Sequence, residues 1–366
     1  MTDRIAIYVP SLRGGGAERV MTILANSFAA RGLAVDLVLA KAKGPYLKDV
    51  SDAVRVVDLG SSRVLFSLPG LARYLRRERP LAMLSALSHA NVVAVWAKQL
   101  ARISTRLVLS ERNTLSISTS GARERRARLL PWLMRCAYPK ADGVVAVSGG
   151  VADDLAATIG LSRQNVMVVY NPVVTEALIR QSHERVAHSW FELGEPPVIL
   201  AVGRLTAQKD YPTLIRAFAR LRAQRTVRLI ILGEGELRGM LETQVAELGL
   251  AADVILPGFM ENPFAWMRRS ALFVLSSAWE GLPGTLIQAM ACAVPVVSAD
   301  CPSGPLEILD NGRWGRLVPV GNAEALAAAM AATLDETEHP DVTVRAADFG
   351  VDQAVNGYLT ALGAGR

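Results

Sequence analysis

The sequence predicts an α/β protein with two domains, each built on a doubly wound parallel sheet. Short apolar runs of β type alternate with helical patterns in both halves of the chain, and a break at Asn171-Pro172 separates the two series. Runs that are apolar on both faces and separated by helices indicate a parallel sheet covered on two sides. A chain of 366 residues is also too long for one ordinary core, so two domains are expected.

The first series defines a Rossmann-like N-terminal domain over residues 1–172. Its clearest helices are Ala17–Arg31 and Asn91–Ala101, and they follow the rule that a crossover helix lies between parallel strands. The predicted strands are Ile5–Val9, Ala34–Leu39, Val54–Asp58, Leu81–Ser85, Leu107–Ser110, Gly143–Val147 and Val166–Tyr170.

The second series defines a similar domain over residues 173–344. After the polar segment Thr175–Phe191, the pattern restarts at Glu195-Pro196-Pro197, and a last helical pattern covers Val351–Leu362. The predicted strands are Val198–Val202, Val227–Leu232, Val254–Leu256, Leu272–Leu275, Val294–Ser298 and Leu317–Val320. Open parallel sheets bind ligands at the carboxyl ends of their strands, so functional residues are expected just after strands.

The composition is that of a globular protein, with 51% hydrophobic and 20% charged residues. The three cysteines, Cys136, Cys292 and Cys301, lack metal-ligand spacing and favour a reducing compartment. The start of the chain does not resemble a signal peptide, and no apolar run is long enough to span a bilayer. A cytoplasmic location is expected.

The net charge of +6 is unevenly distributed. Residues 60–140 carry 15 Lys and Arg against three Glu, an excess of +12. The cluster Arg123–Arg135 is interleaved with apolar residues such as Trp132 at helical spacing, as in a basic amphipathic helix on anionic lipid. A solvated charged face over ordinary core is the alternative, and membrane contact is favoured over it. Nucleic acid is not expected as a partner, because aromatic residues make up only 6% and no binding motif is present.

The segment from Trp279 to Ala291 carries the strongest functional signal. It predicts a turn and then a helix, with Glu280 beside free N–H groups of the helix N-terminus. A carboxylate next to an anion site suits a ligand that has both hydroxyls and phosphate, such as a nucleotide sugar. Taken alone, the segment would also fit a helix entry with an acidic cap.

Further candidates follow other predicted strands. Arg204 and Lys209 bracket the loop after the first strand of the second domain. Two cations there would neutralise a diphosphate, and we favour this interpretation over two solvated surface side chains. Loops that would face the same ligand are Gly14-Gly15-Gly16, Gly203, Gly233-Glu234 and Pro257-Gly258-Phe259, the last beside a nucleobase. The glycine run is not Gly-x-Gly-x-x-Gly, because Arg19 occupies the last position, so a dinucleotide site is poorly supported.

Two polar positions in the first domain stay open. His89 follows a strand and is equally consistent with a structural role and a functional one. Glu111 would orient an acceptor hydroxyl or cap a turn. The absence of Asp-x-Asp removes the obvious carboxylate pair for Mg²⁺ or Mn²⁺, so cations and helix dipoles would have to stabilise a leaving diphosphate.

Taken together, these motifs resemble those of the retaining family-four glycosyltransferases with the GT-B fold, especially bacterial enzymes of surface-polysaccharide synthesis. The resemblance covers nearly the whole chain and depends on the joint order of the motifs. They are Gly14–Val20, Ala146–Ala152, Tyr170-Asn171-Pro172, Gly203-Arg204-Leu205 through Lys209-Asp210-Tyr211, Leu232–Gly235, Glu280–Pro283, and Cys301–Pro305 with Glu307-Ile308-Leu309.

The resemblance implies two Rossmann-like domains that face each other across a cleft, with a C-terminal helix of about residues 345–366 crossing back to the first domain. It assigns Arg204 and Lys209 to the donor diphosphate, Glu280 to sugar hydroxyls, and the backbone of Gly281, Leu282 and Pro283 to phosphate and sugar. Two departures stand out. Gln288 replaces a glutamate that commonly holds the ribose, and the loop with Glu111 lacks the histidine of many relatives.

The expected activity is transfer of a sugar with retention from a nucleotide-diphosphate donor, UDP being favoured on family habit. The expected acceptor is a glycan or a lipid-linked glycan at the inner membrane face, and neither a metal nor a cofactor is expected. The alternatives are a sugar-nucleotide epimerase of the same architecture, a non-catalytic glycan-binding relative and, more distantly, an NAD-dependent oxidoreductase.

Overall fold

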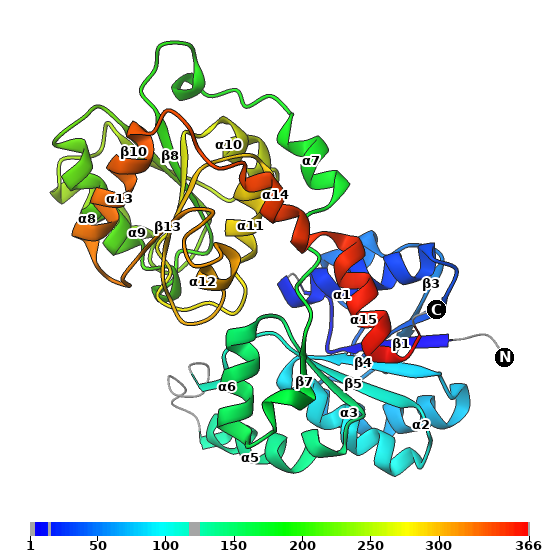
Figure 1. Ribbon diagram of the computed structural model, residues 1–366. Helices are drawn as coiled ribbons and strands as arrows, with labels where there is room; N and C mark the ends of the chain where they lie inside the picture. The colour runs from blue at the N-terminus through cyan, green and yellow to red at the C-terminus, as the bar shows by residue number, and fades with distance from the viewer. Residues whose placement is uncertain (1–3, 14–15, 117–124, 365–366) are drawn as a thin grey trace. The chain divides into compact units, whose positions relative to one another are not determined.

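The computed structural model describes residues 4–13, 16–116 and 125–364. The chain divides into two compact units, Met1–Pro172 together with Val351–Arg366, and Val173–Gly350. Each unit has one sheet with helices on both faces, which confirms the predicted doubly wound α/β architecture (Figure 1).

The first unit contains a seven-stranded sheet in the order β3-β2-β1-β4-β5-β6-β7, and every neighbouring pair is parallel. The strands are β1 (Arg4–Val9), β2 (Ala34–Leu39), β3 (Val54–Asp58), β4 (Ala82–Ala86), β5 (Arg106–Glu111), β6 (Gly143–Ala146) and β7 (Val166–Val168). The helices are α1 (Gly16–Ala30), α2 (Leu68–Glu78), α3 (Ser88–Ala101), α5 (Arg125–Ala137), α6 (Gly149–Ile159) and α15 (Val351–Leu362). The order reverses between β1 and β4, which is where a doubly wound sheet opens a binding crevice.

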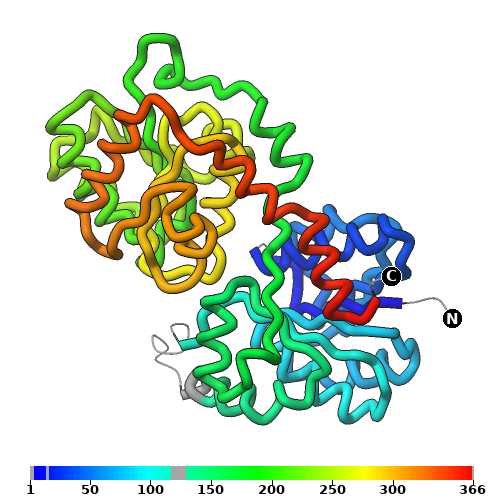
Figure 2. The backbone as a smooth tube through the Cα atoms, in the orientation of Figure 1, coloured from blue at the N-terminus to red at the C-terminus, as the bar shows by residue number. Residues whose placement is uncertain are grey.

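The last helix of the chain belongs to this first unit. Figure 2 shows α15, in red, beside the blue α1. Val355, Tyr358 and Leu362 are buried in the same core cluster as Ile5 and Ile7 of β1. The apolar stripe of α15 therefore completes one face of a sheet whose strands are all encoded more than 180 residues earlier.

Asp36 of β2 is fully buried and held by three donors. Arg4 Nη1 lies 2.6 Å and Arg55 Nη2 2.5 Å from its carboxylate, and the Tyr74 hydroxyl donates to it at 2.6 Å. Burial alone would raise the pKa of Asp36, but the bonds from Arg55 and Tyr74 and the charges of both arginines lower it. This carboxylate therefore joins three strands and α2 in a buried ion cluster. Its oxygens are occupied by these donors and are not presented to a nucleotide ribose.

The second unit contains a six-stranded parallel sheet in the order β10-β9-β8-β11-β12-β13. The strands are β8 (Val198–Val202), β9 (Arg228–Leu232), β10 (Val254–Gly258), β11 (Leu272–Leu275), β12 (Val296–Ala299) and β13 (Arg316–Val318). The helices are α7 (Glu176–Ser182), α8 (Tyr211–Arg222), α9 (Arg238–Glu247), α10 (Pro263–Arg269), α11 (Gly284–Ala291), α12 (Pro305–Ile308), α13 (Ala323–Asp335) and α14 (Val342–Ala346). The neighbours β8 and β11 are the reversal point of this sheet, so their following loops meet at one edge.

Predicted and observed strands agree within two residues at each end. The largest shift at a strand start is at β12, which was predicted from Val294 and begins at Val296. Pro295 lies between the two positions and has no N–H to donate to a ladder. In the described parts of the chain, no helix combines the length and apolar character needed to cross a bilayer.

Candidate functional site

The loops after β8 and β11 are joined by several hydrogen bonds at the carboxyl edge of the second sheet. Ser276 Oγ donates to the Lys209 carbonyl at 2.7 Å, and Ala278 N donates to the Gln208 carbonyl at 2.8 Å. Gln208 Nε2 donates to the Trp279 carbonyl at 3.0 Å. These bonds satisfy backbone groups that leave the ladder at the strand ends, and they hold the two loops in one arrangement.

An ion pair between Lys209 and Glu280 lies at the centre of these loops. Lys209 Nζ is 2.5 Å from Glu280 Oε1, and the two side chains are only 14% and 9% exposed. The structure thus brings together two residues that lie 71 positions apart in the sequence and that we predicted separately. A buried pair of opposite charges places a cation and a carboxylate side by side, as a ligand with phosphate and hydroxyl groups requires.

Gly203 makes room for this pair. A Cβ atom built on Gly203 would lie 2.9 Å from Lys209 Cε and 2.9 Å from the Tyr211 hydroxyl. Any larger residue would push the lysine side chain out of the path that leads to Glu280. This close approach explains why a glycine directly follows β8.

Asp210 starts α8 behind the loop. Its backbone is left-handed, with φ 45°, and its Oδ1 accepts from Thr213 N at 3.4 Å. Aspartate tolerates this conformation and also caps the helix. The motif Lys209-Asp210-Tyr211 therefore turns the chain sharply from the ion pair into α8.

The loop after β12 packs against the Glu280 segment. Glu280 N donates to the Pro302 carbonyl at 3.4 Å, and a Cβ atom on Gly304 would lie 2.4 Å from Pro283 Cδ. Cys301 is buried in this loop, where burial and then the charge of Glu280 raise the pKa of its thiol to about 12. Cys301 therefore stays protonated at neutral pH and is not a nucleophile.

A cavity of about 320 Å³ opens at the ends of β8 and β9. Its walls are mainly apolar and come from Val202, Gly203, Arg204, Leu232, Gly233, Glu234, Phe259, Met260 and Pro263. Phe259 is 75% exposed and follows Pro257 and Gly258 at the end of β10. The cavity suits a flat apolar ring beside the exposed Arg204.

The other predicted donor residues lie in several loops of the second unit and at the start of α1 in the first. Glu234 forms a two-bond ion pair with Arg238, at 2.9 and 2.7 Å, and this lowers the pKa of Glu234. Leu282 and Pro283 are buried at the start of α11, Gly281 is partly exposed, and Gln288 lies partly exposed on α11. Gly16 begins α1 of the first unit, and Gly14 and Gly15 lie outside the described residues.

Glu111 is an interior residue of the first unit, 1% exposed. Its carboxyl group accepts from Ser88 Oγ and Asn91 Nδ2, both at 3.0 Å, and from the Tyr138 hydroxyl. Burial raises the pKa of Glu111. This arrangement gives Glu111 a set of buried partners at the start of α3 and in the turn after α5.

His89 lies one residue into α3. Its side chain is exposed at the surface, and partial desolvation of the imidazole lowers its pKa. The preceding Leu87 has a left-handed backbone, with φ 79°, which is strained for a leucine. The chain thus turns sharply from β4 into α3 at the point where a doubly wound sheet presents ligands.

Ser277 and Gln208 were not singled out from the sequence, yet both contact Glu280. Ser277 Oγ donates to Glu280 Oε1 at 2.7 Å, and Gln208 Nε2 lies 3.5 Å from Oε2. Both lie in the loops that follow β11 and β8, next to residues that the sequence had identified, and their polar side chains in those loops were the available signal.

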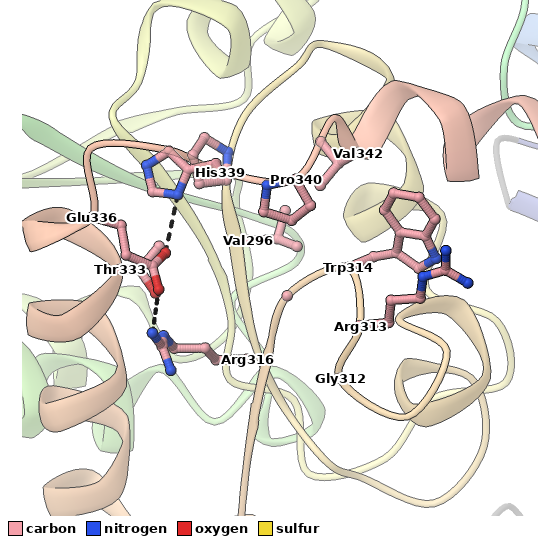
Figure 3. A pocket seen from close by; sticks show the side chains of 12 residues that line it. Val296, Gly312, Arg313, Trp314, Arg316, Thr333, Glu336, His339, Pro340 and Val342 are labelled. Atoms are coloured by element: carbon pink, nitrogen blue, oxygen red, sulfur yellow. Dashed lines mark hydrogen bonds and ion pairs between the residues drawn. The ribbon is translucent and has the colours of Figure 1, made fainter.

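A second pocket, of about 200 Å³, lies at the opposite edge of the second sheet, by the starts of β12 and β13. Figure 3 shows Glu336 between Arg316 and His339, and Arg313 against Trp314 on the other side. His339 Nδ1 is 3.1 Å from Glu336 Oε2. Because the strands point away from this edge, the pocket is separate from the Lys209–Glu280 loops.

Two doubly wound units, one with a buried cation–carboxylate pair beside an apolar cavity, are the features of a GT-B transferase. The chain matches the families described as "Glycosyltransferase Family 4" over residues 14–177 and "Glycosyl transferases group 1" over residues 184–348. It belongs to glycosyltransferase family 4 and is a glycosyltransferase, which confirms the resemblance noted in the sequence.

Three similar proteins illustrate the relationship. The N-acetylgalactosamine-N,N'-diacetylbacillosaminyl-diphospho-undecaprenol 4-alpha-N-acetylgalactosaminyltransferase of Campylobacter jejuni is 30% identical, with 91% of each chain covered. The lipopolysaccharide core biosynthesis glycosyltransferase LpsE of Rhizobium meliloti is 26% identical, with 87% of this chain and 85% of LpsE covered. The crystal structure of Anabaena HepE in complex with UDP and glucose has a TM-score of 0.78 at 21% identity, with 99% of each chain covered, and confirms the GT-B fold.

Proposed function

We propose that this protein transfers a sugar, with retention at its anomeric carbon, from a nucleotide-diphosphate donor to a glycan or lipid-linked acceptor in bacterial cell-envelope synthesis. The observation that supports this most strongly is the buried Lys209–Glu280 pair, in the same strand-end loops that supply Arg204 and Gly203 to the apolar cavity. The names of the relatives from C. jejuni and R. meliloti support the acceptor class, and the HepE complex supports UDP as the nucleotide.

In the proposed donor site, Arg204 and Lys209 balance the charge of the diphosphate, and Glu280 accepts hydrogen bonds from sugar hydroxyls. The cavity by Phe259 holds the base, and Gln288 offers an amide oxygen to the ribose in place of a carboxylate. The backbone N–H groups at the start of α11, after Gly281 and Pro283, add to the stabilisation of the phosphate.

In the proposed transfer, a bond forms between the acceptor oxygen and the anomeric carbon as the bond from that carbon to the phosphate oxygen breaks. The acceptor proton passes to the departing phosphate oxygen on the same face of the sugar. Negative charge grows on the diphosphate as it leaves, and one positioned donor to such developing charge is worth about 10²- to 10³-fold in rate. This scheme uses no divalent metal.

The nucleotide and the reaction can be tested together. A thermal-shift panel of UDP-, GDP- and ADP-sugars should show stabilisation by UDP-sugars first, and transfer to a lipid-linked glycan should continue in EDTA. Loss of transfer on chelation, with rescue by Mn²⁺, would contradict metal independence. A new sugar nucleotide formed from the donor alone would indicate an epimerase, and absence of any transfer or hydrolysis would favour a binding protein.

We also propose that the first unit docks on anionic membrane from the cytoplasmic side. Leu129 and Trp132, three residues apart on α5, are 51% and 59% exposed, and basic residues accompany them along the helix. Phosphatidylglycerol-containing vesicles should retain the parent chain at low salt and release the variant Trp132→Glu. Equal retention of both chains, or retention of neither, would argue against docking through α5.

A further inference from the structure

Ser277 is a fully buried hydroxyl in the loop between β11 and α11. Its Oγ is 2.7 Å from Glu280 Oε1, the same oxygen that Lys209 Nζ approaches at 2.5 Å. One carboxylate oxygen therefore has two donors of different kinds, a cation and a neutral hydroxyl. Hydrogen bonds from both directions fix where this oxygen lies.

Gln208 lies on the side of the other carboxylate oxygen. Its Nε2 is 3.5 Å from Glu280 Oε2 and 3.0 Å from the Trp279 carbonyl. The amide is thus held by the backbone of the residue directly before Glu280. Ser277 and Lys209 thus hold Oε1, and Gln208 lies on the Oε2 side of the same carboxylate.

Lys209 and Ser277 respond differently to a diphosphate. The ammonium group is a mobile charge with three protons, and an arriving diphosphate attracts it. The hydroxyl of Ser277 is neutral, buried and on a short side chain, so it stays where it is. If Lys209 alone held Glu280, the carboxylate would lose its anchor when the donor binds.

We propose that Ser277 is a positioning residue that keeps the Glu280 carboxylate aligned for the donor sugar while Lys209 shares its charge with the diphosphate. This inference rests on the donor site proposed above. It assigns to Ser277 a role in the transfer step and none in holding the nucleotide. Because Glu280 would contact the reacting sugar, losing its orientation should lower kcat more than it weakens nucleotide binding.

The test compares Ser277→Ala and Ser277→Cys with a matched control, Ser298→Ala. Ser298 is also fully buried, on the adjacent strand β12, and its Oγ donates to the backbone carbonyl of Ala299 at 2.9 Å. We expect kcat for the UDP-sugar to fall about 10- to 100-fold in Ser277→Ala, because a hydrogen bond to a charged group is lost. The kcat of Ser277→Cys, whose thiol is a weaker donor of similar size, should lie between those of Ser277→Ala and the parent. Ser298→Ala should retain the parent kcat within about twofold.

The binding of UDP without a sugar separates positioning from structure. Its dissociation constant, measured by calorimetry, should stay within about twofold of the parent in all three variants. Unchanged kcat in Ser277→Ala would overturn the inference, and so would an equal loss of UDP affinity and kcat. If Ser277→Ala does not fold, Ser277→Cys decides in the same way. A parent chain that neither binds nor transfers any nucleotide sugar would instead overturn the proposed function, and this inference with it.

Discussion

The Lys209–Glu280 pair predicts a large coupling energy in the folding of the second unit. The perturbation is a double-mutant cycle with Lys209→Met, Glu280→Gln and the combined variant. The two charges are 2.5 Å apart and 14% and 9% exposed. At an effective dielectric constant of about 20, their gross attraction is about 7 kcal/mol, and the desolvation of both ions offsets several kcal/mol of it.

Removing one partner leaves the other charge buried, at a cost of about 3 kcal/mol for each single variant. The double variant leaves no charge behind and should cost about the same as one single variant. The expected coupling energy is therefore about 3 kcal/mol. Urea unfolding followed by tryptophan fluorescence measures it, because Trp190, Trp266, Trp279 and Trp314 report on the second unit.

A surface pair supplies the control for this cycle. Arg225 and Asp335 lie at a similar distance, 2.6 Å, in the second unit, but their side chains are 32% and 68% exposed. Their coupling energy should be below about 1 kcal/mol. A Lys209–Glu280 coupling below about 0.5 kcal/mol, or no larger than that of the control, would refute the view that burial makes this pair strong.

Three further predictions concern charge. The variant Arg204→Ala/Lys209→Ala should lose at least about 100-fold in kcat in a transfer assay, and parental turnover would remove the basis of the proposed mechanism. Asp36→Asn should lower the free energy of unfolding by about 3 kcal/mol in urea, because it leaves Arg4 and Arg55 without their buried partner. Burial raises the pKa of Glu111 above its usual 4.5, so the folded chain retains a proton that the unfolded chain releases, and stability falls as pH rises above that value. Glu111→Gln should flatten this decline in urea titrations carried out above pH 4.5, and an unchanged slope would show that Glu111 ionises normally.

The sequence was sufficient for the strands, for several of the helices and for the strand-end motifs, although α7 (Glu176–Ser182) formed within the segment that was read as a break. Val54–Asp58, Val198–Val202 and Leu272–Leu275 were predicted with the bounds that the structure shows. Apolar periodicity is a local property, and in a parallel sheet it directly reflects burial on both faces. Glycines and charges placed after such runs then mark the edge where ligands bind.

The contacts between distant loops could not be read from the sequence. The resemblance placed Lys209 and Glu280 at one donor, but nothing in the chain indicates that they would pair directly, or that Ser277 would donate to the same oxygen. These contacts arise because β8 and β11 are neighbours in the sheet although β9 and β10 separate them in the sequence. The environment of Glu111 was equally hidden, because burial by Ser88, Asn91 and Tyr138 depends on how α3 and the turn after α5 pack.

By itself, then, the amino-acid sequence determined the element order, the class of fold and the family to which the chain belongs, since these depend on short-range pattern and ordered motifs. Tertiary structure alone decided which oxygen of Glu280 is held, by which donors, and that Glu111 lies in the interior. The physical reason is that side-chain burial and pairing depend on strand order and helix packing. Strand order and helix packing bring into contact residues that are far apart in the sequence.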